Sequence, residues 1–198
     1  MVLMKEDTKK NLWRLFYWLN WLVIFGFWYS HSGQQLSDWT GALVSLGRIA
    51  GLAAAFMILV QFFLVGRNPL LEKVFGLDRL TKIHHSHGQW ALILLLLHPL
   101  LITYGYSRTT GVNYGTQFWT FLTEYDHIWL AAIGLLLFIT VAVTSIIFAR
   151  RHYRYEAWYV VHLLVYAAIF VSFWHQINLG QDLLVNNIFY LYWLVLYA

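Results

Sequence analysis

The sequence contains no cysteine among its 198 residues. Disulfides, thiolate zinc sites and iron–sulfur clusters ligated within this chain are therefore excluded. It also lacks a His-Glu-x-x-His stretch, the pattern by which one helix presents two zinc ligands and a general base. Charge is scarce as well, because 11% of the residues are charged against about 25% in soluble domains. Combined with an apolar content of 60%, this scarcity indicates a membrane protein.

Long apolar runs divide the chain into membrane-spanning segments. Crossing a hydrocarbon core of ~30 Å takes about 20 mostly apolar residues, and in lipid a helix satisfies its own backbone hydrogen bonds. The sequence predicts spans near Leu12 to Tyr29, Ala42 to Val65, His87 to Tyr104, Ile128 to Phe148, Ala157 to Ile177, and Leu183 to the end. The last run is shorter than a full span, so we expect the sequence to stop inside a sixth helix. The predicted fold is an all-α membrane protein, a six-transmembrane-helix bundle with its sixth helix truncated.

The positions of the basic residues predict the orientation. Eleven of the 13 Lys and Arg lie at the N-terminus or in alternate connections: Lys5, Lys9, Lys10, Arg14, Arg67, Lys73, Arg79, Lys82, Arg150, Arg151 and Arg154. The positive-inside rule assigns that side to the cytoplasm, so we predict a cytoplasmic N-terminus in the plasma (cell inner) membrane. These residues sit on short loops and form no basic surface, which argues against a nucleic-acid partner. Bulky residues follow the first segment, so we expect an uncleaved helix there.

Four histidines inside the third and fifth segments are the candidate ligands. His84 and His98 are fourteen residues apart, and His162 and His175 are thirteen residues apart. Fourteen residues of α-helix bring side chains to within ~40° of one face, about 21 Å apart. Both segments run through the membrane in the same direction, so matched inner and outer imidazoles are expected. Because haem iron takes one axial nitrogen from each side, the sequence predicts two bis-histidine haem sites.

The residues alone leave alternatives open at these sites. A spacing of thirteen residues falls ~140° short of four helical turns, so the fifth helix is locally distorted or the two haem planes are rotated differently. His87, eleven residues before His98, is the fallback inner ligand. A buried histidine can also simply hydrogen-bond a neighbouring helix.

Arg48 is another costly residue, because it lies about seven residues inside the second segment. A buried guanidinium needs an anion, and a propionate of the outer haem would accept a forked pair of hydrogen bonds from it. Snorkelling of the side chain to the outer surface is the alternative. Gly47 and Gly51, four residues apart, would let either a neighbouring helix or a macrocycle approach closely.

Two stretches of the sequence resemble a known family. FGLDRLTKIHHSHGQWALILLLLHPLL and RYEAWYVVHLLVYAAIFVSFWHQ are similar to the third and fifth helices of the ferric-reductase-like transmembrane domain superfamily. That superfamily includes the NADPH oxidases and bacterial flavin-linked ferric reductases. The two histidine spacings agree with the family, as does Gly88, four residues after the first histidine.

The resemblance implies a fold and a ligand set. It implies that residues 1–198 form a six-helix transmembrane domain that binds two haems b, and that a cytoplasmic FAD- and NAD(P)H-binding dehydrogenase domain follows residue 198, outside this chain. By the same resemblance, His84 pairs with His162 on the inner haem and His98 pairs with His175 on the outer haem. Arg48 matches the family's arginine near the outer haem.

The resemblance also implies an electron path, and at this path the chain departs from the family. Many members have an aromatic side chain between the haems at the position where this chain has Ala168. Tyr166 and Phe170 are the candidate substitutes, although neither shares the face of Ala168.

The activity implied is that of an NAD(P)H oxidase or ferric reductase-type oxidoreductase. Electrons would pass from cytoplasmic FAD and NAD(P)H through the haems to an acceptor on the outer side, either oxygen, giving superoxide, or a ferric chelate. The alternative function is a haem b membrane subunit that passes electrons from quinol or a separate flavoprotein to a partner reductase. Membrane lipid is the expected surrounding, and the sequence makes no prediction of oligomeric state.

Overall fold

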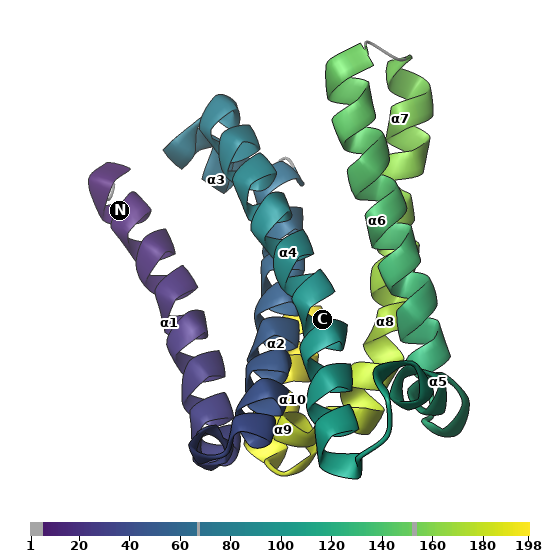
Figure 1. Ribbon diagram of the computed structural model, residues 1–198. Helices are drawn as coiled ribbons and strands as arrows, with labels where there is room; N and C mark the ends of the chain where they lie inside the picture. The colour runs from purple at the N-terminus through teal and green to yellow at the C-terminus, as the bar shows by residue number, and fades with distance from the viewer. Residues whose placement is uncertain (1–5, 67, 152–153) are drawn as a thin grey trace. The chain divides into compact units, whose positions relative to one another are not determined.

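The computed structural model describes residues 6–66, 68–151 and 154–198, and this part of the chain is helical apart from short connections (Figure 1). Lys5, Arg67 and His152 lie outside the described residues. The chain divides into two compact units, the first ending at His98 and the second beginning at Pro99, apart from the last residues of the chain.

Four helical segments of the described chain are long and apolar enough to cross a membrane. They are α2 (Trp39–Val65), α4 (Leu77–Thr110), α6 (Ile128–Arg151), of which the apolar part ends at Phe148, and the α7–α8 segment (Tyr155–Leu179). These segments contain the second to fifth predicted spans. α1 (Glu6–Ser32) is as long as α2, at 27 residues, but it is less apolar because polar residues interrupt it. Its membrane crossing stays a prediction.

In the first unit, α1 and α2 are joined through the short 3-10 helix η1 (Gly33–Ser37) (Figure 1). The Asp38 carboxylate begins α2 by accepting a hydrogen bond from the Gly41 amide at 3.0 Å, which satisfies a backbone donor at the helix start. The Trp28 indole N–H donates to the Ser45 carbonyl at 2.9 Å. The Ser45 hydroxyl donates to the Ser32 carbonyl at 2.9 Å. The end of α1 is therefore tied to the start of α2.

The connection between α2 and α4 is itself helical. α3 (Pro69–Phe75) begins where the Asn68 side chain accepts from the Leu70 amide at 3.0 Å, and Pro69 fits this position because a first-turn residue needs no N–H. Gly76 then adopts φ 78°, a left-handed conformation that a side chain would disfavour. This glycine separates α3 from α4.

The third predicted span is part of a longer helix. α4 has 34 residues and begins at Leu77. Arg79 and Lys82 therefore lie in its first turns, whereas the sequence predicted them in a connecting loop. Pro99 lies inside this helix, where it removes one backbone hydrogen bond. The boundary between the two units falls at this proline.

In the second unit, α6 packs closely along α8 (Leu164–Leu179) (Figure 1). A Cβ added at Gly134 of α6 would lie 3.0 Å from the Ala168 carbonyl oxygen and closer still to the Ser172 hydroxyl. Ala168 is fully buried. Small residues on both helices therefore set their close approach, as is usual between membrane helices.

The remaining helices of this unit are short. α5 (Tyr114–Glu124) begins at Asn113, whose side chain accepts from the Thr116 amide at 2.9 Å. The prediction that the last segment starts at Leu183 is wrong, because α9 (Gln181–Leu184) and α10 (Asn187–Tyr197) are separate helices. Asn186 separates α9 from α10, because its side chain accepts a hydrogen bond from the Ile188 amide at 2.9 Å and thereby begins α10.

Candidate functional site

His98, on α4, has its ring fixed against α2. Its Nδ1 lies 2.8 Å from the Gly47 carbonyl oxygen. A carbonyl can only accept, so Nδ1 carries the proton and donates, which leaves the lone pair of the neutral ring on Nε2. A Cβ added at Gly51 would come within 2.7 Å of the same Nδ1. Gly47 and Gly51 therefore admit the imidazole of the predicted outer ligand.

His162, the last residue of α7, has its tautomer set by Ser145 of α6. The Ser145 hydroxyl donates its single proton to the Val141 carbonyl at 2.7 Å, so its remaining contacts must be accepted bonds. It accepts from the Trp158 indole N–H at 3.2 Å. The His162 Nδ1, at 3.3 Å from the same oxygen, must then be the protonated nitrogen as well. The Trp158 ring lies beside the imidazole, with centroids 5.1 Å apart.

A break in the helix follows His162 directly. α7 ends there, and α8 begins at Leu164. Around the break the Leu163 amide donates to the Tyr159 carbonyl at 3.1 Å, and the Tyr166 amide donates to the Leu163 carbonyl at 3.1 Å. The second bond spans three residues instead of four, which is a tighter turn than an α-helix makes. Local distortion, one of the two explanations for the thirteen-residue spacing, is therefore present between His162 and His175.

His84 and His98 lie on one uninterrupted stretch of α4. Both belong to the first unit, whose boundary on this helix follows His98. The Gln61 side-chain amide of α2 donates to the His84 carbonyl at 3.1 Å, and it also faces Gly88, where an added Cβ would lie 3.1 Å from Gln61 Nε2. The backbone around His84 and the ring of His98 thus both meet α2. The Gln61 Oε1 is buried with no hydrogen-bond partner among the described residues.

His87, the fallback inner ligand, is held differently. The Tyr17 hydroxyl of α1 lies 3.2 Å from His87 Nε2, and the two rings lie 5.6 Å apart between centroids. His85, one turn before Gln89, is exposed and lies 3.2 Å from the Gln89 side chain through its own Nε2. The Nε2 atom of each of these two histidines is therefore engaged by a neighbouring side chain.

His175 is half-buried in α8, in the second unit together with His162. Its neighbour Gln176 accepts a hydrogen bond from the Trp193 indole of α10 at 3.1 Å. Gln176 also donates to the Ser172 carbonyl at 3.2 Å. α10 is thereby linked to the part of α8 that carries the predicted outer ligand.

Arg48 is half-buried on α2, and its guanidinium donates from Nη1 to the Ser32 hydroxyl at 3.2 Å. Ser32 is fully buried at the end of α1. The side chain thus reaches the end of α1, and Arg48 directly follows Gly47, whose carbonyl contacts His98. Arg48 and His98 are both anchored to this part of α2.

Tyr166 and Phe170 lie on the outer surface of α8, with 58% and 65% of their area exposed. Ala168, between them in sequence, faces α6 and is fully buried. The Ala168 carbonyl oxygen would lie 3.0 Å from a Cβ added at Gly134 of α6, so the two helices lie close together at position 168. Tyr166 and Phe170 therefore stay predictions as parts of an electron path, on a face other than that of Ala168.

Some residues around the histidines were not singled out by the sequence analysis. Gln61 and Ser145 each contact a candidate ligand. Both are polar residues in otherwise apolar helices, and this was the available signal for them. Among the described residues, no three His, Asp or Glu side chains gather as they would to hold a metal ion together.

Comparison with known proteins identifies the family. Residues 50–173, more than half of the chain, match the family model described as ferric reductase like transmembrane component. The chain belongs to the ferric reductase-like transmembrane family. The protein is therefore an integral membrane protein of a family of oxidoreductases, and its membership indicates transmembrane electron transfer. The matched residues include His84, His98 and His162, whereas Arg48 precedes them and His175 follows them.

A relative of this ferric reductase-like chain is found in an archaeon. An uncharacterized protein of Archaeoglobus fulgidus is 28% identical over 130 residues, which are 64% of this chain and 71% of the relative. No solved structure matches the chain.

Proposed function

We propose that this ferric reductase-like protein carries electrons across the membrane through two haems b. His84, His98, His162 and His175 would hold the haem irons, and Arg48 would bind a propionate of the outer haem. When bound, the haems supply one-electron transfer by cycling their iron between the ferric and ferrous states. The chain itself positions these groups and sets the proton on the rings of His98 and His162.

The hydrogen bond from His98 Nδ1 to the Gly47 carbonyl, 2.8 Å long, is the observation that best supports this proposal. A histidine that ligates a metal through one nitrogen usually donates the other N–H to a carbonyl, carboxylate or water, which fixes the tautomer and orients the ring. His162 has the same tautomer through Ser145. Two candidate ligands in different units of the chain thus share the arrangement that the chemistry needs.

Gly51 also supports the role of His98 as a ligand, because it leaves room for the imidazole. Any side chain there would collide with the His98 ring, because an added Cβ would lie 2.7 Å from Nδ1. His87 fits less well as the inner ligand than His84, because its Nε2, the nitrogen through which haem iron is usually bound, is already engaged by Tyr17 at 3.2 Å.

We propose further that electrons enter from FAD reduced by NAD(P)H on the cytoplasmic side. Two histidines per iron leave no position for direct ligation of an acceptor, so oxygen or a ferric chelate would take its electron at the outer surface. With the inside negative, outward movement of an electron is favoured by about 2.3 kcal/mol per 100 mV. The direction of transfer thus agrees with the membrane potential.

Haem content per chain tests the proposal. Purified wild type should hold two haems b by absorbance, and His98→Ala and His162→Ala should each hold no more than one. His85→Ala is the matched control, because His85 is exposed and lies on the same helix as His98. It should retain the wild-type content. Wild-type haem content in both ligand variants would refute the assignment.

A further inference from the structure

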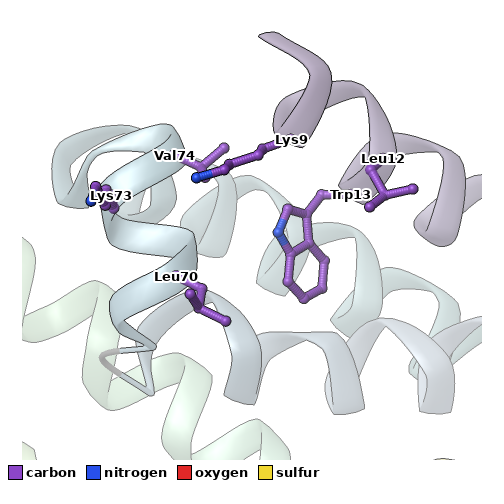
Figure 2. Close-up of a pocket in the computed structure, with 6 residues that line it drawn as sticks. All are labelled: Lys9, Leu12, Trp13, Leu70, Lys73 and Val74. Atoms are coloured by element: carbon purple, nitrogen blue, oxygen red, sulfur yellow. The ribbon is translucent and has the colours of Figure 1, made fainter. Parts of the chain in front are cut away.

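A pocket of about 170 Å³ lies between α1 and α3 in the first unit (Figure 2). Its lining combines apolar side chains with two lysines: Leu12, Trp13, Leu70, Val74, Lys9 and Lys73. Empty apolar cavities of about 150 Å³ can take up a benzene-sized group. The pocket is therefore large enough for a short piece of hydrocarbon.

The two lysines place positive charge at this pocket. Lys9 extends from α1 toward α3, above the ring of Trp13 (Figure 2). Among the described side chains, which do not include that of Glu6, neither Lys9 nor Lys73 has a carboxylate within 4.0 Å, whereas Lys10 lies 3.9 Å from Asp7. Together the two ammonium groups can bind an external anion.

The sequence predicts that the pocket lies where the chain passes from water to lipid. Lys9 lies three residues before Leu12, where the first predicted span starts, and α3 is the short connection between α2 and α4. Trp13 is half-buried between them, and tryptophan is enriched at membrane–water interfaces. The same end of this unit carries Arg79 and Lys82 in the first turns of α4. Such clusters of basic residues mark the side that faces anionic lipid.

We infer that this pocket binds an anionic phospholipid of the cytoplasmic leaflet. Its phosphate would lie between Lys9 and Lys73, and the beginning of an acyl chain would pack against Trp13 and Leu70. A soluble phosphate would contact only the two lysines and would leave the apolar side chains of the pocket without a partner. A zwitterionic phospholipid would bring its own cation beside two ammonium groups. The assignment of the leaflet rests on the orientation proposed above.

Native mass spectrometry of the full chain in detergent, titrated with phosphatidylglycerol or with phosphatidylcholine carrying the same acyl chains, tests this inference. Lys9→Gln/Lys73→Gln should weaken binding of the first phosphatidylglycerol by roughly tenfold or more, because each lysine near a lipid surface contributes about a fivefold effect. It should leave phosphatidylcholine binding unchanged. Leu70→Ser, at a position 66% exposed, should weaken phosphatidylglycerol binding without affecting folding.

The matched control is Arg79→Gln/Lys82→Gln. This variant loses the same charge from exposed positions on the same end of the unit, outside the pocket. It should keep phosphatidylglycerol binding within about twofold of wild type. Equal losses in both double variants would overturn the inference in favour of general charge attraction. Displacement of phosphatidylglycerol by inorganic phosphate would overturn it in favour of a simple anion site, and unchanged binding in the pocket variant would overturn it outright.

Discussion

At the scale of single residues, His98 and His162 have one feature in common. In each, Nδ1 donates a hydrogen bond. His98 donates to the Gly47 carbonyl, and His162 donates to the Ser145 hydroxyl, whose own proton is donated to Val141. The sequence pointed to both histidines, because an ionisable residue in an apolar run is conspicuous. It could not identify the Gly47 carbonyl, since every residue offers one and packing decides which is near.

Ser145→Ala is expected to raise the midpoint potential of the haem ligated by His162. The hydrogen bond from Nδ1 makes the ligand a better electron donor and favours ferric iron, so its loss favours ferrous iron. A difference of about 1 kcal/mol between the two oxidation states corresponds to ~40 mV for one electron. Redox titration of the purified protein measures the shift. Ser145→Thr keeps the hydroxyl and should stay near wild type, and a potential that falls in the alanine variant would contradict the prediction.

Asp38 gives a pH dependence at the residue scale. Hydrogen bonds from the Thr40 hydroxyl and then from the Gly41 amide lower the pKa of its carboxyl below the ordinary value of 3.8. A lowered folded-state pKa means that the cap stabilises α2 fully above that ordinary value and is lost as pH falls through the lowered one. Protection of the Gly41 amide from hydrogen exchange, corrected for the intrinsic rate, should therefore fall in this acid range. Asp38→Asn still caps a helix and should show no such transition; an equal transition there would assign it to another group.

At the scale of elements, the fifth predicted span shows where periodicity stops being informative. The apolar run from Ala157 to Ile177 has no proline or glycine to mark a break. The thirteen-residue histidine spacing allowed a local distortion in this helix, and the structure places one at Leu163. The break follows His162, whose ring and whose neighbour Trp158 both bond to Ser145. These side-chain contacts are tertiary and leave no mark on local propensity.

The packing of α6 on α8 yields a stability prediction. Gly134→Ala should lower the free energy of unfolding by about 1–3 kcal/mol, because overpacking forces the helices apart where Ala168 and Ser172 leave no room. Gly26→Ala is the matched control, since nothing lies within 4 Å of a Cβ at Gly26 and alanine is the better helix former by ~1 kcal/mol. Thermal unfolding in detergent, followed by helical circular dichroism, measures both. Equal effects of the two substitutions would show that close packing is not the cause.

At the scale of the whole molecule, composition was sufficient to identify a membrane protein. Apolar side chains that a soluble protein would bury are exposed here, including Leu22 at 68% and Ile188 at 72%. This exposure is expected of side chains that face lipid. Composition does not fix the number of spans, because α1 carries Asn, Trp and Tyr among its apolar residues, and these reduce its hydropathy without shortening the helix.

The absence of native cysteine makes the predicted orientation easy to test. In intact cells, a membrane-impermeant maleimide should label Ser37→Cys and Val112→Cys, both exposed and in predicted outer connections. Asp78→Cys, exposed at the start of α4, should be labelled only after permeabilisation. The cysteine-free wild type should remain unlabelled throughout. The reverse pattern would place the N-terminus outside and the lipid pocket in the other leaflet.

The sequence by itself determined the membrane class, the second to fifth helices, the family and the candidate histidines. The class and the helices follow from composition and hydropathy, the histidines from their positions in apolar runs, and the family from the resemblance of two sequence stretches. Only the tertiary structure decided which nitrogen of His98 and His162 carries the proton, that Ala168 is buried against α6, and where α7, α9 and α10 begin and end. These depend on groups far apart in sequence, Gly47 with His98 and Gly134 with Ala168, and such contacts exist only once the helices have packed.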